Sequence, residues 1–271
     1  MNPYIRLLRP INCVMASLAV PVAIFIMNQE FIQTKYIIVG IASVIVFLVT
    51  GGGNALNDYS DREVDKINHP DRPIPSGEIS PKNALILSII LFSVSVVLAY
   101  LFLDFLTAIV VVLAIFLLGV YEGFTKRLGF VGNLNVSALV GLIFIYAGFL
   151  THEYFKSLFP FLLAFLSNVG REIAKDIEDV SGDVDRKTLP MRIGITKARE
   201  VSSSFFLAAV ALSPLPYFFS LFSIYYIPVV IVSDIIFVLA AITVFYNAGK
   251  AQRISKIAMV FGLLAFFAGG F

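Results

Sequence analysis

Charged residues, cysteine and histidine are scarce in this chain, and each scarcity excludes a class of protein. Only 14% of the 271 residues are charged, 59% are hydrophobic, and the mean hydropathy is +0.91. Soluble domains carry about 25% charged residues, and a soluble fold could not hide this much apolar surface. The composition therefore predicts a polytopic membrane protein. The single cysteine, Cys13, excludes an internal disulfide framework.

Long apolar runs divide the chain into about nine expected membrane spans. They cover residues 11–27, 36–56, 84–103, 105–121, 132–150, 156–171, 201–220, 226–246 and 255–271. The run from Ala84 to Val120 is too long for one crossing and holds a single charge, Asp104, where we expect a tight hairpin. The expected fold is an all-α bundle that forms one intramembrane domain over residues 1–271.

The distribution of Lys and Arg predicts how the chain is oriented. If the N-terminus is cytoplasmic, 18 of the 20 Lys and Arg residues fall in the inside segments, as the positive-inside rule requires. These segments are residues 1–10, 57–83, 121–131, 171–200 and 247–256. We therefore expect a cell-membrane protein with a cytoplasmic N-terminus. The two histidines, His69 and His152, lie on opposite sides in this topology, which argues against a histidine-based zinc or iron site.

Six acidic residues are concentrated in residues 57–78, on the expected cytoplasmic side. Asn57, Asp61 and Asp65 follow an i, i+4, i+8 spacing, which places them on one face of an α-helix, with Asp58 to the side. Taken alone, the cluster is equally compatible with a solvated, charge-alternating helix end.

Basic residues and prolines surround these acids. Like charges four residues apart repel, so we expect Arg62 and Lys66 to offset part of the charge and a bound divalent cation to offset more. Three prolines within residues 70–75 fix their φ angles and predict a stiff turn. Arg72, inside this turn, is positioned for an anionic partner.

A second acid cluster lies in "GREIAKDIEDVSGD", residues 170–183. Glu172, Asp176, Asp179 and Asp183 are spaced i, i+4, i+7, i+11, which keeps them within roughly 60° on a continuous helix. The two clusters follow the second and sixth spans, so both are expected on the same membrane side. Mg²⁺ prefers carboxylate and phosphate oxygens, and carboxylates mixed with Arg and Lys predict a metal-bridged diphosphate site.

These motifs resemble those of the UbiA superfamily of intramembrane prenyltransferases. "NDYSDREVD" (57–65) is similar to the first aspartate-rich motif of that family, N-D-x-x-D-x-x-x-D, and "KDIEDVSGD" (175–183) is similar to the second. The expected nine spans, with both motifs in the same-side loops, resemble the family across the whole chain. The resemblance implies a prenyltransferase with two Mg²⁺ ions bridging a prenyl diphosphate, and an isoprenoid tail in a cavity open to the lipid.

The resemblance also implies roles for individual residues. The residues implied as metal ligands are Asn57, Asp61 and Asp65, with Asp58 beside them, and Asp176, Asp179 and Asp183. Those implied to bind the diphosphate are Arg72, Lys126, Arg127, Arg171, Lys175 and Lys187. The residues implied to be catalytic are Asp61, Asp65, Asp176, Asp183 and Lys126.

Two segments bear on the acceptor. "DKINHPDRPIPSGEIS" (65–80) is similar to the loop of chlorophyll synthases and of archaeal ether-lipid enzymes, and residues 170–183 followed by "KTLP" (187–190) resemble the latter more closely. This implies geranylgeranyl transfer from geranylgeranyl diphosphate to the sn-2 hydroxyl of geranylgeranylglyceryl phosphate. An aromatic or tetrapyrrole acceptor, as in quinone, haem O or chlorophyll synthesis, remains the alternative. The implied partners are these substrates and membrane lipid, with no nucleic acid and no obligate protein partner.

A cation-coupled transporter is the rival from a different class, because transporters place acidic side chains within their spans. Asp234 is the one acid expected well inside a span, and an odd number of spans does not divide into two similar halves. A non-catalytic prenyl-lipid scaffold would need no second acid motif. The sequence therefore favours the enzyme over both.

Overall fold

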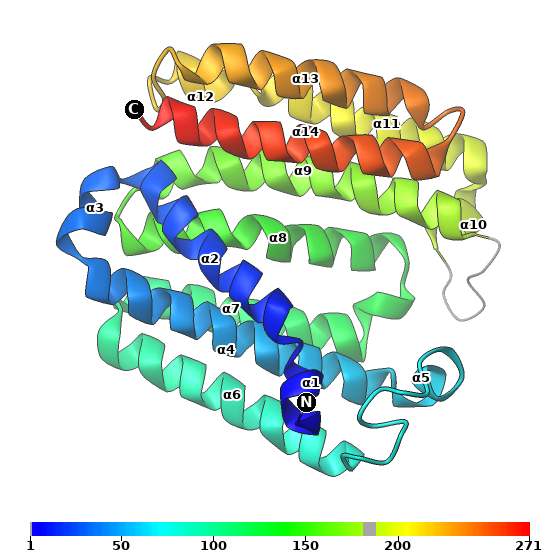
Figure 1. Cartoon of the computed structure of the whole chain (residues 1–271). Coiled ribbons are helices and arrows are strands. Elements are labelled where there is room, and N and C mark those ends of the chain that lie inside the picture. The colour runs from blue at the N-terminus through cyan, green and yellow to red at the C-terminus, as the bar shows by residue number, and fades with distance from the viewer. Residues whose placement is uncertain (1, 181–187) are drawn as a thin grey trace. The chain divides into compact units, whose positions relative to one another are not determined.

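The computed structural model describes residues 2–180 and 188–271, which form fourteen α-helices and one 3₁₀ turn (Figure 1). Among these residues, eight helices are long and apolar enough to cross a membrane. The chain divides into two compact units. Unit 1 comprises Met1–Ile24 with Glu30–Gly123, and unit 2 comprises Phe25–Gln29 with Phe124–Phe271.

Unit 1 is built around one long helix, α4. Its elements are α1 (Pro3–Leu8), most of α2 (Pro10–Met27) and α3 (Gln29–Thr34), α4 (Tyr36–Ser60), α5 (Arg62–Asn68), α6 (Pro81–Phe102) and α7 (Phe105–Gly123). Helix α4 packs against α1, α6 and α7 (Figure 1). Gly52 permits the contact with α6, since a Cβ there would lie 2.7 Å from a ring carbon of Phe92. The first acid motif thus starts from a helix held on several sides.

The hairpin expected at Asp104 is confirmed. Helix α6 ends at Phe102 and α7 begins at Phe105. The Asp104 carboxylate accepts a hydrogen bond from the Thr107 N–H at 3.0 Å, which satisfies one of the first amides of α7.

The proline-rich segment after α5 is an ordered turn, as its composition predicts. Its backbone hydrogen bonds include Ser76 N–H to Arg72 O at 3.0 Å and Ile79 N–H to Pro73 O at 2.9 Å. Ile79 is buried in an apolar cluster that also contains Leu7 of α1. The turn is therefore fixed to the body of unit 1 by apolar contacts as well as by its own hydrogen bonds.

Unit 2 is centred on α9. Its elements are the 3₁₀ turn Thr125–Arg127, α8 (Phe130–Leu150), α9 (Tyr154–Asp179), α10 (Leu189–Ile193), α11 (Ile195–Leu212), α12 (Leu215–Phe218), α13 (Tyr226–Thr243) and α14 (Ala248–Gly269). Helix α9 packs against α8, α11 and α14, and α13 packs against α11 and α14 (Figure 1). The second acid cluster lies at the end of this central helix.

Two helices of unit 2 extend beyond the expected spans. The span expected at residues 156–171 lies within α9, whose C-terminal part carries the second acid cluster, and α9 is not among the eight apolar helices. Helix α14 begins at Ala248 rather than at residue 255, because Asn247 accepts a hydrogen bond from the Lys250 N–H at 2.8 Å and caps the helix. In these two helices the chain therefore stays helical through charged residues that lie outside the apolar spans expected from the sequence.

A short N-terminal segment, Phe25–Gln29, belongs to unit 2 although the chain on both sides of it belongs to unit 1. The ring of Phe25 stacks on Phe267 with centroids 4.4 Å apart. The Gln29 amide donates to Gly270 O at 2.5 Å, and Lys156 Nζ donates to Met27 O at 3.1 Å. The C-terminal end of α2 is thus tied to helices that come much later in the sequence.

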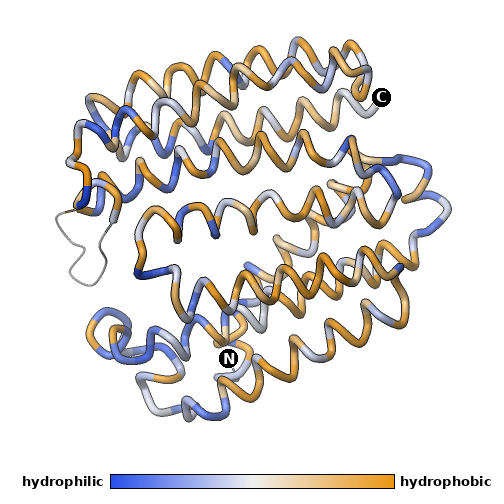
Figure 2. The backbone as a smooth tube through the Cα atoms, turned by 180° about the vertical axis from the view of Figure 1, so that it is seen from behind, coloured by the Kyte–Doolittle hydropathy of each residue, from blue (hydrophilic) through white to orange (hydrophobic). Residues whose placement is uncertain are grey.

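Hydropathy follows the helices closely. Figure 2 shows hydrophobic residues along most of the long helices and hydrophilic residues in α5, the adjoining turns and several helix ends. The long helices also expose large apolar side chains, among them Met15, Phe116 and Ile235. This pattern is that of a multi-pass membrane protein, whose helices face lipid along their lengths and water at their ends.

Replacing Gly148 by alanine should destabilise unit 2. A Cβ on Gly148 would lie 2.2 Å from the Cβ of Ser157 and 3.0 Å from the carbonyl oxygen of Glu153, so α8 and α9 would have to separate. We expect Gly148→Ala to cost about 1–3 kcal/mol, as overpacking does, and to lower the melting temperature in detergent. Gly40→Ala is the control, because a Cβ at Gly40 meets nothing within 4 Å. Equal melting temperatures for the two variants would contradict the close approach.

Candidate active site

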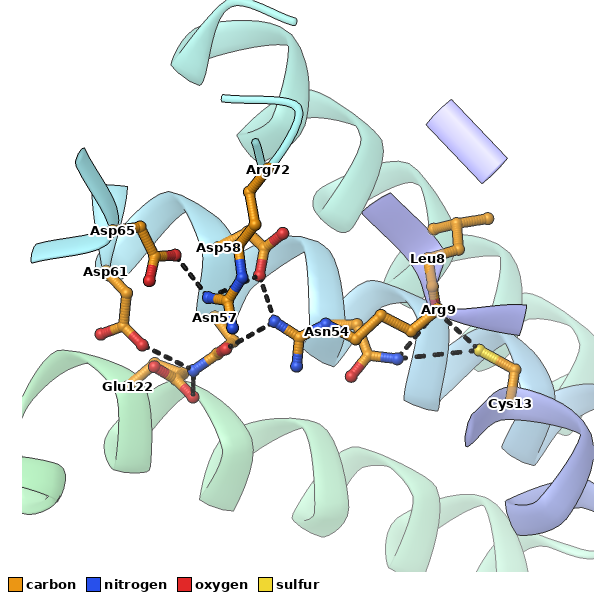
Figure 3. Close-up of polar contacts among 10 residues, drawn as sticks. All are labelled: Leu8, Arg9, Cys13, Asn54, Asn57, Asp58, Asp61, Asp65, Arg72 and Glu122. Carbon is orange, nitrogen blue, oxygen red and sulfur yellow. Dashed lines mark hydrogen bonds and ion pairs between the residues drawn. The ribbon is translucent and has the colours of Figure 1, made fainter. Parts of the chain in front are cut away.

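The first acid motif spans the junction of α4 and α5, with Asp61 between the two helices. The helical hydrogen bonds continue through the junction: Asp61 N–H donates to Asn57 O at 2.9 Å, and Asp65 N–H donates to Asp61 O at 2.8 Å. The predicted spacing therefore holds in three dimensions, and the motif side chains gather as one polar group (Figure 3).

Two arginines from outside the motif pair with its two buried carboxylates. The side chains of Asp58 and Asp65 are 3% and 5% exposed. Arg9 Nη2 forms an ion pair with Asp58, and Arg72 Nη1 lies 2.5 Å from Asp65 Oδ2 and 3.7 Å from Asp58 Oδ1 (Figure 3). Because an unpaired buried carboxylate is costly, these guanidinium groups are the counter-ions that permit the burial. Arg72, expected to contact diphosphate, thus also contacts two carboxylates of the acid motif.

Arg62 and Lys66, expected to offset the motif's charge, make other contacts. The guanidinium carbon of Arg62 lies 4.7 Å from the centroid of the Tyr59 ring. Lys66 Nζ donates to Glu63 Oε2 at 2.7 Å, and this hydrogen bond, together with the lysine charge, lowers the pKa of the exposed Glu63 carboxyl. These contacts of Arg62 and Lys66 are with Tyr59 and Glu63 and not with the carboxylates that Arg9 and Arg72 reach.

Glu122, on α7, joins the motif and was missed by the sequence prediction. The Asn57 amide donates to Glu122 Oε1 at 2.9 Å and to Asp61 Oδ2 at 3.2 Å (Figure 3). One amide group therefore holds two carboxylates that come from different helices. The available signal was the position of Glu122 directly after the fourth expected span, on the same predicted membrane side as the motif.

A sharp corner between α1 and α2 positions Arg9. Arg9 has a left-handed backbone, φ 52° and ψ 68°, which is uncommon for a residue other than glycine and stores strain. The Asn54 amide donates to Leu8 O at 2.8 Å, and Cys13 Sγ lies 3.0 Å from the same oxygen (Figure 3). These contacts hold the corner in place, so that the Arg9 side chain reaches Asp58.

The second acid cluster lies at the C-terminal end of α9, in unit 2. The Asn133 amide, on α8, donates to Asp176 Oδ2 at 2.7 Å. Asp179 is exposed at the last residue of the helix, and Asp183 lies outside the described residues. The sequence prediction located Asp176 but missed Asn133, which stands in "GNLN" shortly after the expected loop.

Lys126 lies in the 3₁₀ turn that precedes α8. A Cβ on Gly132 would lie 2.7 Å from the carbonyl oxygen of Thr125, so the turn packs directly on the first turn of α8. Gly129, with φ 63°, supplies the left-handed backbone that joins the turn to the helix. The position of Lys126 is therefore fixed by backbone geometry.

The other basic residues expected to bind diphosphate are placed in different ways. Arg127 and Lys175 are exposed. Arg171 forms an ion pair with the neighbouring Glu172, and their side chains are 18% and 15% exposed. Lys187 lies outside the described residues.

Within residues 2–180 and 188–271, no group of three or more Asp, Glu, His or Cys side chains converges to hold a metal ion. In the first motif, this is because Asp58 and Asp65 are turned toward arginines. The donor atoms still suit Mg²⁺, which takes carboxylate and amide oxygens together with substrate phosphates. The set in unit 1 comprises Asn57, Asp61 and Glu122 as well as the two paired acids.

Similar solved structures share the fold. A solved structure of a digeranylgeranylglyceryl phosphate synthase superposes with a TM-score of 0.91 at 33% identity, over 99% of this chain and 97% of the other. A UbiA homologue from Archaeoglobus fulgidus, bound to DMAPP and Mg²⁺, gives a TM-score of 0.71 at 17% identity, over 97% of this chain and 98% of the other.

Related sequences agree over the full length. The digeranylgeranylglyceryl phosphate synthase of Methanosphaera stadtmanae is 41% identical, over 98% of this chain and 97% of the relative. That of Methanothermobacter thermautotrophicus is 39% identical, over 99% of this chain and 96% of the relative. The sequence pattern described as the UbiA prenyltransferase family matches residues 16–268. With its acid motifs, its helical fold and these relatives, the chain belongs to the UbiA prenyltransferase family.

Proposed function

We propose that the chain transfers a geranylgeranyl group from geranylgeranyl diphosphate to the sn-2 hydroxyl of geranylgeranylglyceryl phosphate, releasing diphosphate. The observation that carries this proposal is full-length similarity, near 40% identity, to digeranylgeranylglyceryl phosphate synthases. The product is the archaeal ether-lipid core, so the proposed role is membrane lipid synthesis. The two units would act together as one prenyltransferase domain.

The reaction breaks the bond between the allylic C1 and the diphosphate oxygen and forms an ether bond between C1 and the sn-2 oxygen. The O–H bond of the hydroxyl breaks as the ether forms, and its proton is released to solvent together with the diphosphate. The allylic group can separate from the leaving group because its positive charge is delocalised. The main requirements are therefore to stabilise the departing diphosphate and to exclude water, which would otherwise capture the allylic group.

The acid motifs supply the first requirement by holding cations. Bound Mg²⁺ would neutralise charge that develops on the diphosphate. In unit 1, we propose Asn57, Asp61 and Asp65 as its ligands, with Asp58 and Glu122 beside them. In unit 2, the proposed ligands are Asp176, Asp179 and Asp183. Two ions, one for each motif, fit this division.

Basic residues would contact the diphosphate directly, since Arg and Lys make charge-assisted hydrogen bonds to phosphate oxygens. The proposed contacts are Arg72, Lys126, Arg127, Arg171, Lys175 and Lys187. Lys126 is the best supported by geometry, because its turn is held rigidly against α8. The apolar helices would exclude water from the reacting carbon.

We also propose that the N-terminus and both acid motifs face the cytoplasm. The support is the charge distribution, with 18 of 20 Lys and Arg residues in the segments assigned to that side. This side is also where a water-soluble diphosphate product would be released.

Purified protein should form digeranylgeranylglyceryl phosphate from the two proposed substrates in the presence of Mg²⁺, and none in excess EDTA. The measurement is chromatography of a radiolabelled prenyl product, with an aromatic acceptor offered in parallel. Product on the aromatic acceptor alone would move the chain to another branch of the family. Transfer to neither, by folded protein, would contradict the proposed activity.

Asp61→Asn should reduce kcat/KM by about 10²–10³, the usual loss when one charge-stabilising group is removed, and raise the Mg²⁺ concentration for half-maximal rate. Glu63→Gln is the matched control, because Glu63 is 68% exposed and lies on the outer side of the same segment, beside Lys66. It should stay within about twofold of the unmodified protein, since exposed pairs contribute little. Similar losses in both variants would indicate a general charge effect and not a metal ligand.

Arg72→Gln should destabilise the fold as well as reduce activity, because it leaves the buried Asp65 without the partner at 2.5 Å. The double variant Arg72→Gln/Asp65→Asn should recover part of the lost stability, with a coupling of about 1–3 kcal/mol. Thermal unfolding of the four proteins in detergent measures this, and Lys66→Gln is the control at an exposed pair. Additive losses would show that the ion pair does not contribute to the fold.

A further inference from the structure

A pocket of about 720 Å³ opens beside the first acid motif, within unit 1. Three arginines line it, Arg6 and Arg9 from the N-terminal segment and Arg72 from the proline-rich turn. The acidic residues of the lining are Asp58 and Asp71. The lining therefore has an excess of positive charge and lies next to the residues proposed to hold the departing diphosphate.

The arginines can accept a further anionic partner. Arg6 pairs with Glu78 at 2.9 Å, with side chains 33% and 36% exposed, and also donates through Nη2 to the carbonyl oxygen of Asp71. Exposed ion pairs of this kind contribute little to stability. Each guanidinium carries five N–H donors. The contacts of Arg9 with the acid motif run through Nη2, and those of Arg72 run through Nη1. A phosphate monoester, with three terminal oxygens, suits several guanidinium groups at once.

The chemistry of the proposed acceptor requires a phosphate subsite close to the reacting atoms. In geranylgeranylglyceryl phosphate, the phosphate ester is on the carbon next to the one that carries the sn-2 hydroxyl. A phosphate bound far from the acid motif would hold that hydroxyl away from the allylic carbon. The pocket meets this requirement, because Asp58 belongs both to its lining and to the motif, and Arg72 joins the pocket to Asp65.

An apolar surface begins at the same pocket. Ile11 lines it, and Ile11, Met15 and Leu18 are exposed at i, i+4, i+7 along α2, which places them on one face of the helix. The isoprenoid chain already attached to the acceptor could follow this face while the phosphate remains in the pocket. An amphiphilic ligand therefore fits the site better than a free ion does.

We propose that this pocket binds the phosphate of the lipid acceptor through Arg6 and Arg9, with Arg72 between this phosphate and the diphosphate, and so places the sn-2 hydroxyl beside the first acid motif. The inference rests on the proposed function. The alternative is that basic residues of unit 2, such as Arg127, bind that phosphate. The two assignments predict that different substitutions raise KM for the acceptor.

Arg6 is the residue to change first, because its partners are the partly exposed Glu78 and the carbonyl oxygen of Asp71, so no buried carboxylate loses its counter-ion. Arg6→Gln should raise KM for geranylgeranylglyceryl phosphate about tenfold, as expected for a lost charge-assisted hydrogen bond. The kcat and the KM for geranylgeranyl diphosphate should stay within about twofold, because the Arg6 interaction is made equally in the ground and transition states. Arg6→Lys should recover part of the affinity.

Glu78→Gln should change KM for the acceptor in the direction opposite to Arg6→Gln. An ion pair with a purely structural role would not give this result. Removing Glu78 frees Arg6 for the ligand, so KM for the acceptor should fall. If Arg6 and Glu78 only stabilise the fold, both variants should alter KM in the same direction. Lys82→Gln is the matched control, because Lys82 is an exposed base of unit 1 at the start of α6.

Two further comparisons identify the ligand. With geranylgeranylglycerol, which lacks the phosphate, Arg6→Gln and the unmodified protein should have equal KM values. Nanodiscs of neutral lipid and of anionic phosphatidylglycerol separate the acceptor from bulk lipid, since an effect of Arg6→Gln that appears only in anionic discs would assign the pocket to a membrane headgroup and overturn the proposal.

The inference and the proposed function fail in different ways. If the unmodified protein transfers no prenyl group to geranylgeranylglyceryl phosphate, the proposed function fails. If it does so and Arg6→Gln leaves the acceptor KM unchanged, while Arg127→Gln raises it, only the phosphate subsite is misplaced.

Discussion

The candidate site depends on one electrostatic constraint: a carboxylate buried at the end of a membrane helix needs a counter-ion. Asp58 forms an ion pair with Arg9, from the N-terminal corner, and Asp65 forms one with Arg72, from the proline-rich turn. These two segments are otherwise unrelated in sequence and secondary structure. In both segments hydrogen bonds hold the backbone, and a counter-ion held in this way stays next to its carboxylate.

Rigid backbone at the helix ends is accordingly a common feature of both units. In unit 1, Asn54 holds a left-handed corner that directs Arg9 toward the motif. In unit 2, the close approach at Gly132 holds the turn that carries Lys126. Neither arrangement contributes a reacting group by itself. Each fixes the direction of a cationic side chain, and charge stabilisation is strongest when the charges are already in place before the reaction.

The features that could be predicted from the sequence are those with a period or a strong local preference. The apolar runs located the long helices, Asp104 marked the hairpin, and the acid spacing placed Asn57, Asp61 and Asp65 on successive turns. The partners of these acids could not be predicted in this way. Arg9 is separated from Asp58 by 49 residues and Glu122 from Asn57 by 65, and such contacts depend on how the helices pack. Local charge instead pointed to Arg62 and Lys66, which contact Tyr59 and Glu63.

The Phe25–Gln29 segment has a consequence for the order in which the protein is made. Its contacts with Phe267 and Gly270 join residues that emerge from the ribosome about as far apart in time as this chain allows, since Gln29 and Gly270 are 241 positions apart. The first membrane helix, α2, therefore enters the bilayer long before the residues that contact its C-terminal end have been synthesised. Unit 2 cannot be completed until the last helix has been synthesised, and a chain truncated before α14 would leave an early aromatic segment exposed to the lipid and to the quality-control machinery of the membrane.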